Sequence, residues 1–273
     1  MNTFDKIAEA SKFLNTFNIH RSKVAVVLGS GLGNFVQELV VEKEIPYENI
    51  PHFPVSTVKG HSGKLIFGSI AGKHIIAMAG RFHFYEGYTA EDVVFPIRVM
   101  KFLGVETVLI SNAAGGVDPS FKVGDLMIIR DHISMATINP LLGKNDDRIG
   151  PRFPDMSEPY KKELIHKAKE IGAAMGVELK EGIYYGVTGP TFETHAEYRM
   201  IYLLGAHAVG MSTVQEVIAA VHIGLHVFAM SVITDIGIRE EDNVITHDEV
   251  LQAAKEAEPK FSGIFKELIA SLY

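Results

Sequence analysis

Apolar runs alternate with helical patterns along the whole chain. Short apolar runs at residues 24–28, 105–110, 182–187, 206–211 and 227–233 predict buried strands. Residues 65–67 and 74–78 flank Ala71-Gly72 and predict a hairpin. Amphipathic patterns predict helices over residues 4–17, 89–102 and 158–175. Three further helices are predicted to begin at capping boxes, which are formed by Thr194 with Glu197, Thr213 with Glu216 and Thr246 with Glu249. This alternation predicts an α/β fold with a mixed central β-sheet flanked by helices.

The chain has no internal boundary in its sequence. No linker, low-complexity tract or repeat divides the 273 residues, so we expect a single domain over residues 1–273. Residues 130–157 have little periodicity and are long for a connection, which indicates a functional or interfacial segment. Most of the unusual polar motifs follow predicted strands, and sites in α/β folds gather at the carboxyl ends of strands.

Composition excludes several classes of function. The formal net charge of −7 opposes binding to nucleic acid, which needs a basic surface, and the absence of cysteine rules out disulfides and thiolate chemistry. Residues 1–10 lack the apolar core of a secretory signal. The most apolar stretch, residues 214–233, is interrupted by Glu216, His222, Gly224 and His226 and does not predict a membrane span. We therefore expect a cytoplasmic protein without nucleic-acid or membrane partners.

Residues 189–194 combine a rigid turn, an aromatic ring and a carboxylate. Gly189-Pro190 fixes the backbone, Phe192 offers a face for stacking, and Glu193 can accept two N–H donors. This set suits a flat, hydrogen-bonding ring such as a nucleobase. The segment also predicts a helix cap at Thr194. A base-binding role and a capping role can therefore coexist in the same residues.

Two other segments suit an anion. The sequence Gly-Ser-Gly-Leu-Gly at residues 29–33 follows a strand, so its N–H groups and the Ser30 hydroxyl can hold a phosphate. Its third glycine comes one position too early for a dinucleotide-binding motif. In residues 80–87, Arg81 offers a planar fork for phosphate oxygens and His83 a donor or proton relay. The alternative there is a structural ion pair between Arg81 and Glu86.

The remaining candidates are less specific. His61 lies between glycines, Met211 suits a ligand contact or the core, and Ser212 follows a strand without the surroundings of a nucleophile. The histidines form no metal-binding motif, and His222 and His226 straddle Gly224, so we predict no metal.

In combination and order, these motifs resemble the trimeric purine nucleoside phosphorylases of the inosine–guanosine type. The likeness covers nearly the whole chain, through residues 28–33, 60–63, 80–87, 112–116, 152–154, 189–194 and 210–214. It implies a reversible phosphorolysis of purine ribo- or deoxyribonucleosides to free base and pentose 1-phosphate. It also implies that phosphate is a co-substrate, that no cofactor is needed, and that the enzyme is a homotrimer.

The resemblance assigns roles to residues of this chain. The implied phosphate site consists of Ser30, His61, Arg81, His83, the backbone of Ala113 and Ser212. Tyr85 and Met211 match positions around the ribose, His247 matches a contact to the 5′-hydroxyl, and Phe153 matches a ring contributed by a neighbouring subunit. Phe192 matches the ring that stacks on the base, and Glu193 matches the carboxylate that reads the purine N1 edge. His83, Glu193 and Asp235 are the candidate catalytic residues.

Two positions depart from the family pattern. Asp235 stands where the family usually has asparagine, followed by atypical residues 236–238, and Gln215 replaces a usual proline. An ionised aspartate only accepts hydrogen bonds, so it suits a 6-amino group better than a 6-oxo group. We therefore expect the enzyme to accept 6-aminopurines as well as 6-oxopurines.

Three alternatives stay open at this point. A methylthioadenosine phosphorylase also has aspartate at the position of Asp235, but His247 and Ser212 oppose it. A noncatalytic nucleoside-binding protein would have no use for the phosphate residues. A nicotinamide-dependent oxidoreductase would rest on the glycine turn alone. Phosphate dependence of the activity separates the binding protein and the oxidoreductase from a phosphorylase. A comparison of methylthioadenosine with inosine, guanosine and adenosine separates the two kinds of phosphorylase.

Overall fold

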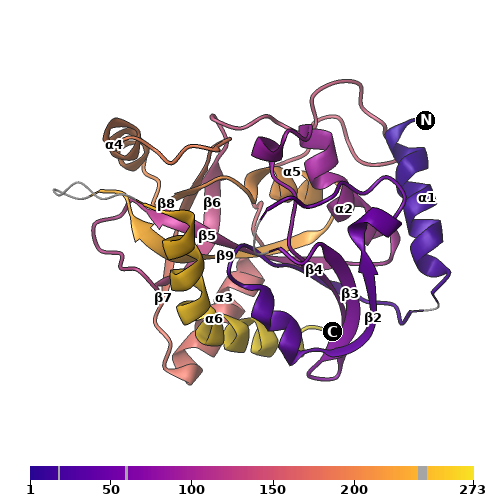
Figure 1. The fold of residues 1–273 in the computed structure, drawn as a ribbon, viewed down its shortest axis with the longest axis horizontal. Coiled ribbons are helices and arrows are strands. Elements are labelled where there is room, and N and C mark those ends of the chain that lie inside the picture. The colour runs from indigo at the N-terminus through magenta and orange to yellow at the C-terminus, as the bar shows by residue number, and fades with distance from the viewer. Residues whose placement is uncertain (18, 59–60, 239–244) are drawn as a thin grey trace.

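A computed structural model describes residues 1–17, 19–58, 61–238 and 245–273. Within these residues, nine strands form one sheet with helices on both faces (Figure 1). The strands are β1 (Val24–Val27), β2 (Val40–Pro46), β3 (Lys64–Ile70), β4 (Lys73–Ala79), β5 (Thr107–Gly116), β6 (Leu126–Ile133), β7 (Leu179–Gly186), β8 (Ala208–Gly210) and β9 (His226–Ile236). The predicted hairpin is confirmed as β3 and β4.

The strand order explains where the site forms. The order is β2-β3-β4-β1-β5-β8-β7-β6-β9, and β9 also pairs with β5, so β5, β8, β7, β6 and β9 close a ring of paired strands. The sheet is mixed, because β3 is antiparallel to β4 and β6 to β9. By contrast, β1 is parallel to both β4 and β5, and β5 is parallel to β9. The carboxyl ends of these parallel strands therefore meet at one edge, where α/β folds place their sites.

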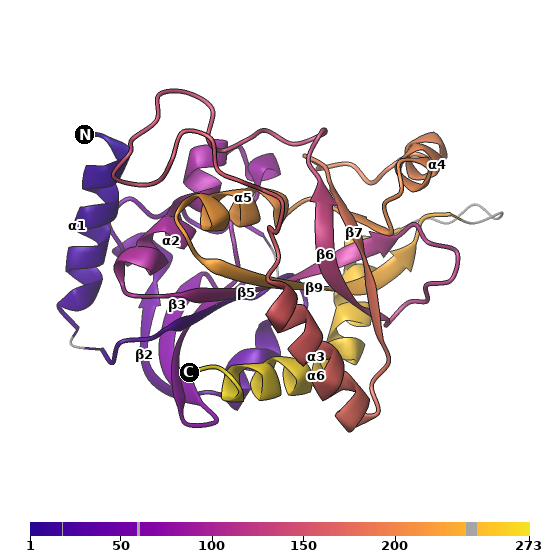
Figure 2. The ribbon, with the colours of Figure 1, turned by 180° about the vertical axis from the view of Figure 1, so that it is seen from behind.

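The helices cover the sheet in two groups. They are α1 (Thr3–Asn15), α2 (Ala90–Phe102), α3 (Lys162–Met175), α4 (His195–Leu203), α5 (Val214–His222) and α6 (His247–Ala270), with short 3-10 helices η1 (Gly33–Glu38), η2 (Tyr47–Asn49) and η3 (Phe84–Glu86). Figures 1 and 2 show α1, α2 and α5 on one face and α3 and α6 on the other. Among the described residues, we find no helix with the length and hydrophobicity needed to cross a membrane.

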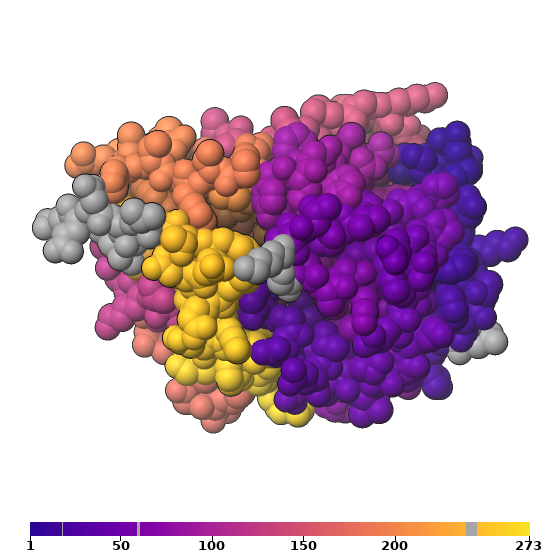
Figure 3. All heavy atoms as spheres, in the orientation of Figure 1, coloured from indigo at the N-terminus to yellow at the C-terminus, as the bar shows by residue number. Residues whose placement is uncertain are grey.

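The C-terminal helix packs directly on the turn after β1. Gly31 has a φ of +77°, and a Cβ added there would lie 2.5 Å from the Ala254 Cβ of α6. Glycine at this position therefore permits both the turn and the close approach of the helix. Figure 3 shows α6, in yellow, against the indigo N-terminal part of the chain. The same helix brings its first residue, His247, to the pocket.

The capping predictions for α4 and α6 are confirmed. The side chains of Thr194 and Thr246 accept hydrogen bonds from the N–H groups of Glu197 and Glu249, whose carboxylates accept in return. At α5, the Glu216 carboxylate accepts from the N–H of Thr213 at 3.2 Å.

The structure corrects several predicted elements. Strand β2 was missed because this edge strand is mostly exposed and has no buried apolar run. Residues 130–133, predicted to be irregular, continue β6, and residues 111–116 continue β5 despite their small side chains because they pair with β9. Helix α3 begins at Lys162, not at residue 158, because Pro159 disfavours helical backbone at the residue before it.

Candidate active site

A cavity of about 500 Å³ opens at the shared strand edge. Ser30 follows β1, Arg81 and His83 follow β4, Ala113 lies in β5 and Asp235 lies in β9. The other predicted residues that line the cavity are Tyr85, Phe192, Glu193, Met211, Ser212 and His247. Segments that are far apart in the sequence thus converge because the parallel strands end together.

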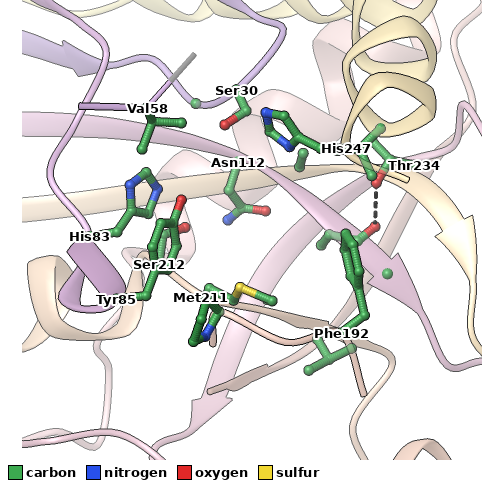
Figure 4. Close-up of a pocket in the computed structure, with 18 of the residues that line it drawn as sticks. Ser30, Val58, His83, Tyr85, Asn112, Phe192, Met211, Ser212, Thr234 and His247 are labelled. Carbon is green, nitrogen blue, oxygen red and sulfur yellow. Dashed lines mark hydrogen bonds between the residues drawn. The ribbon is translucent and has the colours of Figure 1, made fainter. Parts of the chain in front are cut away.

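The cavity has two ends with different side chains. Figure 4 shows His83, Tyr85 and Ser212 on one side, Phe192 on the opposite side, and Met211 between them. Ser30 and His247 lie along the same edge of this view. We call the region around His83 and Ser212 the anion end and the region around Phe192 the base end.

Arg81 is the buried cation of the anion end. Its side chain is 1% exposed, and Nη1 donates to Ser212 Oγ at 2.9 Å while Nη2 donates to the carbonyl oxygen of Ser111. Nε lies 3.5 Å from the carboxylate of Glu216. The alternative of an Arg81–Glu86 pair is therefore wrong. The protein fixes the guanidinium from several sides, and Arg81 lines the cavity.

Glu86 instead holds His83. Its carboxylate lies 3.1 Å from His83 Nδ1 and accepts from the hydroxyl of Thr57 at 2.6 Å. Burial would raise the pKa of Glu86, but the hydrogen bonds from His83 and Thr57 outweigh it and lower the pKa to about 2. Burial lowers the pKa of His83, and the bond to Glu86 opposes this. His83 is thus a neutral, oriented imidazole at neutral pH.

His61 lies one layer behind the cavity wall. Its Nε2 lies 3.4 Å from Ser30 Oγ, and its Nδ1 accepts from the backbone N–H of Arg81 at 3.2 Å. Burial, with the nearby charges of His83 and Arg81, lowers the pKa of His61 to about 3. The side chain is therefore neutral and can support Ser30 without adding charge.

Thr213 is held in a conformation that β-branched residues avoid. Its φ is 72°, in the left-handed region. Asn112 donates to its hydroxyl at 2.8 Å, and Glu216 accepts from its N–H at 3.2 Å. Such strain persists only where surrounding contacts fix it, and here it fixes the neighbouring Ser212 beside Arg81.

The base end contains two carboxylates. Asp235 is 7% exposed and accepts from Thr234 Oγ1 at 3.1 Å, the dashed line in Figure 4. A Cβ added to Gly115 would lie 2.9 Å from Asp235 Oδ2, so glycine makes room for this carboxylate. Burial raises the pKa of Glu193, and the charge of Asp235 adds to the rise.

The middle of the cavity is apolar and tightly packed. Gly189 has a φ of +65°, and a Cβ there would lie 2.4 Å from the sulfur of Met211. The Tyr85 ring stacks on His83 with 4.7 Å between centroids, and burial raises the pKa of Tyr85 to about 12. Tyr85 therefore stays protonated, and its ring lines the cavity together with Met211.

Comparison with known proteins identifies the family. Residues 23–270 match the Phosphorylase superfamily. The chain is 46% identical over 266 residues to purine nucleoside phosphorylase 1 of Geobacillus stearothermophilus, covering 97% of each chain. The chain belongs to the purine nucleoside phosphorylase family. The predicted family and fold class are confirmed.

Solved structures of purine nucleoside phosphorylases have the same fold. Isoform 2 from Schistosoma mansoni, in complex with cytosine and ribose-1-phosphate, superimposes with a TM-score of 0.94 at 41% identity, covering 99% of this chain and 97% of that chain. A Schistosoma mansoni purine nucleoside phosphorylase in complex with adenosine gives a TM-score of 0.93 at 37% identity, covering 98% of each chain.

Phe153 is a predicted site residue that does not line the cavity. It is 86% exposed, outside the cavity, in the irregular connection between β6 and α3. A single chain therefore does not bring Phe153 to the pocket. Its predicted role requires a neighbouring subunit, and that role stays a prediction.

Sequence reasoning left several lining residues unassigned. These are Thr57, Glu86, Asn112, Tyr198 and Thr234. Asn112 had a usable signal, because a polar side chain at the end of an apolar strand is unusual. Tyr198 had none, because an aromatic residue in the first turns of an amphipathic helix is an ordinary core residue.

A possible cation cluster lies elsewhere. Among the described residues, His20, Glu42 and His74 bring ligand atoms within 4.8 Å of one another. Their contacts are ion pairs of 3.1 and 2.9 Å at the β2 side of the sheet, and none of them lines the cavity. This cluster therefore lies apart from the cavity.

Proposed function

We propose that the cavity catalyses the phosphorolysis of purine nucleosides, in which phosphate displaces the base from C1′ of a ribose or deoxyribose. One observation carries this proposal: a single cavity of about 500 Å³ joins the anion end around Arg81 to the base end around Phe192 and Glu193. The products are a free purine and a pentose 1-phosphate, and the reaction is reversible. Membership of the purine nucleoside phosphorylase family supports the same activity.

The anion end holds the attacking phosphate. Arg81 supplies charge, and Ser30, His83, Ser212 and the backbone of Ala113 line the same cavity and supply hydrogen-bonding groups. Glycosidic cleavage passes through an oxocarbenium-like state, so a phosphate dianion beneath C1′ stabilises the sugar while it attacks. His61 supports Ser30 from behind. No covalent enzyme intermediate is needed.

The base end stabilises the leaving purine. Electrons of the broken C1′–N9 bond move into the ring, and hydrogen bonds to its edges stabilise this charge. Phe192 stacks on the ring, Glu193 faces the N1 edge and Asp235 faces N7. Tyr85 and Met211 pack around the sugar, and His247 contacts the 5′-hydroxyl.

The preference for the 6-substituent is part of the proposal. Asp235 accepts a 6-amino hydrogen more readily than an asparagine would, so adenosine is a substrate beside inosine or guanosine. A Schistosoma mansoni relative was solved with adenosine, which supports this tolerance. Methylthioadenosine phosphorolysis is disfavoured, because His247 places a polar ring where a methylthio group needs an apolar contact.

The assembly and surroundings complete the proposal. A homotrimer would let Phe153 of one subunit close the ribose site of the next, and the exposure of this ring supports such a contact. The reaction needs neither a metal nor an organic cofactor. A cytoplasmic location agrees with the absence of cysteine.

One assay tests the function. Inosine, guanosine, adenosine and methylthioadenosine are each incubated with and without phosphate, and free base and pentose 1-phosphate are measured. We expect release of base from the first three only with phosphate. Equal release without phosphate would indicate a hydrolase, and activity confined to methylthioadenosine would establish the alternative.

A further inference from the structure

Tyr198 lies at the base end with no assigned role. This α4 side chain is 4% exposed and lines the cavity together with Glu193 and Asp235. Its hydroxyl makes no hydrogen bond of regular geometry with any described residue, although it lies close enough to the Glu193 carboxylate to interact with it. Buried hydroxyls are almost always paired in good geometry, so a hydroxyl at a cavity wall with only this loose contact can still donate to a ligand.

The backbone after β9 fixes the position of the Tyr198 ring. A Cβ added to Gly237 would lie 2.2 Å from both Cδ1 and Cε1 of that ring. The ring therefore fills the space that any side chain at position 237 would need. Gly237 follows Asp235 by two residues, so the same segment positions the carboxylate and the phenol.

The Tyr198 hydroxyl interacts with both carboxylates. Burial raises the pKa of Tyr198 well above its ordinary value, and the charges of Glu193 and Asp235 raise it further. The hydroxyl opposes the rise in the pKa of Glu193 that burial causes. Tyr198 thus keeps its proton at neutral pH and offers a hydrogen-bond donor beside groups that accept.

The geometry of a purine indicates what this donor meets. The proposed function, on which this inference rests, sets Glu193 against the N1 edge and Asp235 against N7. The 6-substituent of a purine lies between N1 and N7, so a hydroxyl near both carboxylates is placed against it. We propose that Tyr198 is a specificity-determining residue whose hydroxyl donates a hydrogen bond to the oxygen of a 6-oxopurine.

This donor resolves a conflict within the base end. An ionised Asp235 can only accept and repels a 6-oxo oxygen, whereas Tyr198 provides the proton that this oxygen needs. A 6-amino group donates to Asp235 and does not depend on Tyr198. The pair Asp235 and Tyr198 therefore lets one pocket bind both kinds of purine.

The test removes the hydroxyl and keeps the ring. Tyr198→Phe preserves the packing on Gly237, and kcat/KM is measured with inosine, adenosine and the purine nucleoside that carries only hydrogen at C6. We expect a loss of roughly 10- to 100-fold for inosine, because its buried oxygen is left without a donor. The other two nucleosides should change by less than about threefold, and the phosphate KM should stay unchanged.

Tyr185→Phe is the matched control. Tyr185 is 4% exposed in the same apolar cluster as Tyr198 but does not line the cavity, so its variant should keep the wild-type ratio of inosine to adenosine. Gly237→Ala, which displaces the ring, should reduce inosine use more than adenosine use. Its effect on that ratio should shrink in the Tyr198→Phe background, because the two changes affect one contact.

The outcomes separate this inference from the proposed function. If Tyr198→Phe lowers kcat/KM equally for inosine, adenosine and the unsubstituted nucleoside, or lowers it for none of them, Tyr198 does not read the 6-substituent. If wild type releases base without phosphate, the proposed function itself fails, whatever the variant does.

Discussion

Arg81 and Glu216 form an ion pair in which Nε lies 3.5 Å from Oε1, although the side chains are only 1% and 3% exposed. Glu216 also accepts from the N–H of Thr213, whose neighbour Ser212 accepts from Arg81. The cation, the serine and the strained threonine are therefore one unit. In the proposed mechanism these contacts organise the anion end in advance of the phosphate, which is the arrangement that electrostatic catalysis requires.

Arg81→Ala should impair phosphate use and stability together. Loss of a charge-assisted contact made in the transition state should lower kcat/KM, which corresponds to a loss of transition-state stabilisation on the order of 2–4 kcal/mol. The affinity for phosphate should be most affected. The variant also leaves the buried Glu216 charge unpaired, which should reduce the free energy of unfolding by about 3–5 kcal/mol. Steady-state kinetics with varied phosphate and denaturant titrations measure the two effects.

A surface ion pair provides the control for Arg81. Lys266 and Glu38 lie 2.8 Å apart with both side chains well exposed, so Lys266→Ala should leave kinetics and stability nearly unchanged. A stable Arg81→Ala variant with wild-type phosphate KM would remove Arg81 from the phosphate site.

Phe153 should connect activity to assembly. If its ring closes a neighbouring subunit's ribose site, light scattering should show a trimer, and Phe153→Ala should raise the nucleoside KM while the phosphate KM stays nearly constant. Val40→Ala is the matched control, because Val40 is 72% exposed on the distant edge strand β2. A fully active monomer at assay concentration would contradict the prediction.

His61 should make the free enzyme less stable in mild acid. Its pKa is about 3 in the folded protein against 6.5 as a free side chain, so the folded state binds fewer protons than the unfolded state. The stability it contributes is complete above pH 6.5 and falls by about 1.4 kcal/mol per pH unit below it. Phosphate-free unfolding titrations at two pH values measure this slope. His61→Asn should make the free energy of unfolding depend less on pH. His166 is an exposed histidine, so His166→Asn should leave this pH dependence as in wild type.

Glu193 should couple substrate choice to pH. Because its pKa is raised, it begins to take up a proton at a higher pH than an ordinary glutamate. The ionised form accepts from the N1–H of inosine, whereas the protonated form donates to the bare N1 of adenosine. The adenosine-to-inosine ratio of kcat/KM should therefore rise as pH falls from about 8 to about 5. In Glu193→Gln this ratio should not vary with pH, and a pH-independent ratio in wild type would count against Glu193 as the N1 contact.

Local motifs predicted most of the cavity because its residues follow strands. Ser30, Arg81 and Ser212 each come within a few residues of an apolar strand, and parallel pairing of β1, β4 and β5 brings two of these strand ends together. Phe192 and Glu193 could be predicted as base-binding candidates from the chemistry of an aromatic ring next to a carboxylate. The structure places these side chains in one cavity, while their individual roles stay predictions.

Features set by long-range contacts could not be predicted. The extension of β5 through Gly116 depends on its pairing with β9, and the left-handed φ of Thr213 depends on Asn112, which is 101 residues away. Tyr198 faces the cavity because Gly237 leaves room for its ring. None of these relationships is present in a local pattern, since each one joins distant segments.

Asp235→Asn should shift substrate preference towards 6-oxopurines. Wild type is expected to accept adenosine measurably beside inosine or guanosine, because the buried carboxylate accepts from a 6-amino group but only repels a 6-oxo oxygen. Asparagine can donate to that oxygen, so the inosine-to-adenosine ratio of kcat/KM should rise by roughly 1–3 kcal/mol in free-energy terms. A competition assay with both nucleosides measures the shift, and the Thr234→Val variant, which removes the hydroxyl that donates to Asp235, should change the ratio less. If wild type rejects adenosine and the asparagine variant keeps the same ratio, Asp235 is only a buried strand-end carboxylate, and the 6-substituent is read by other residues of the base end.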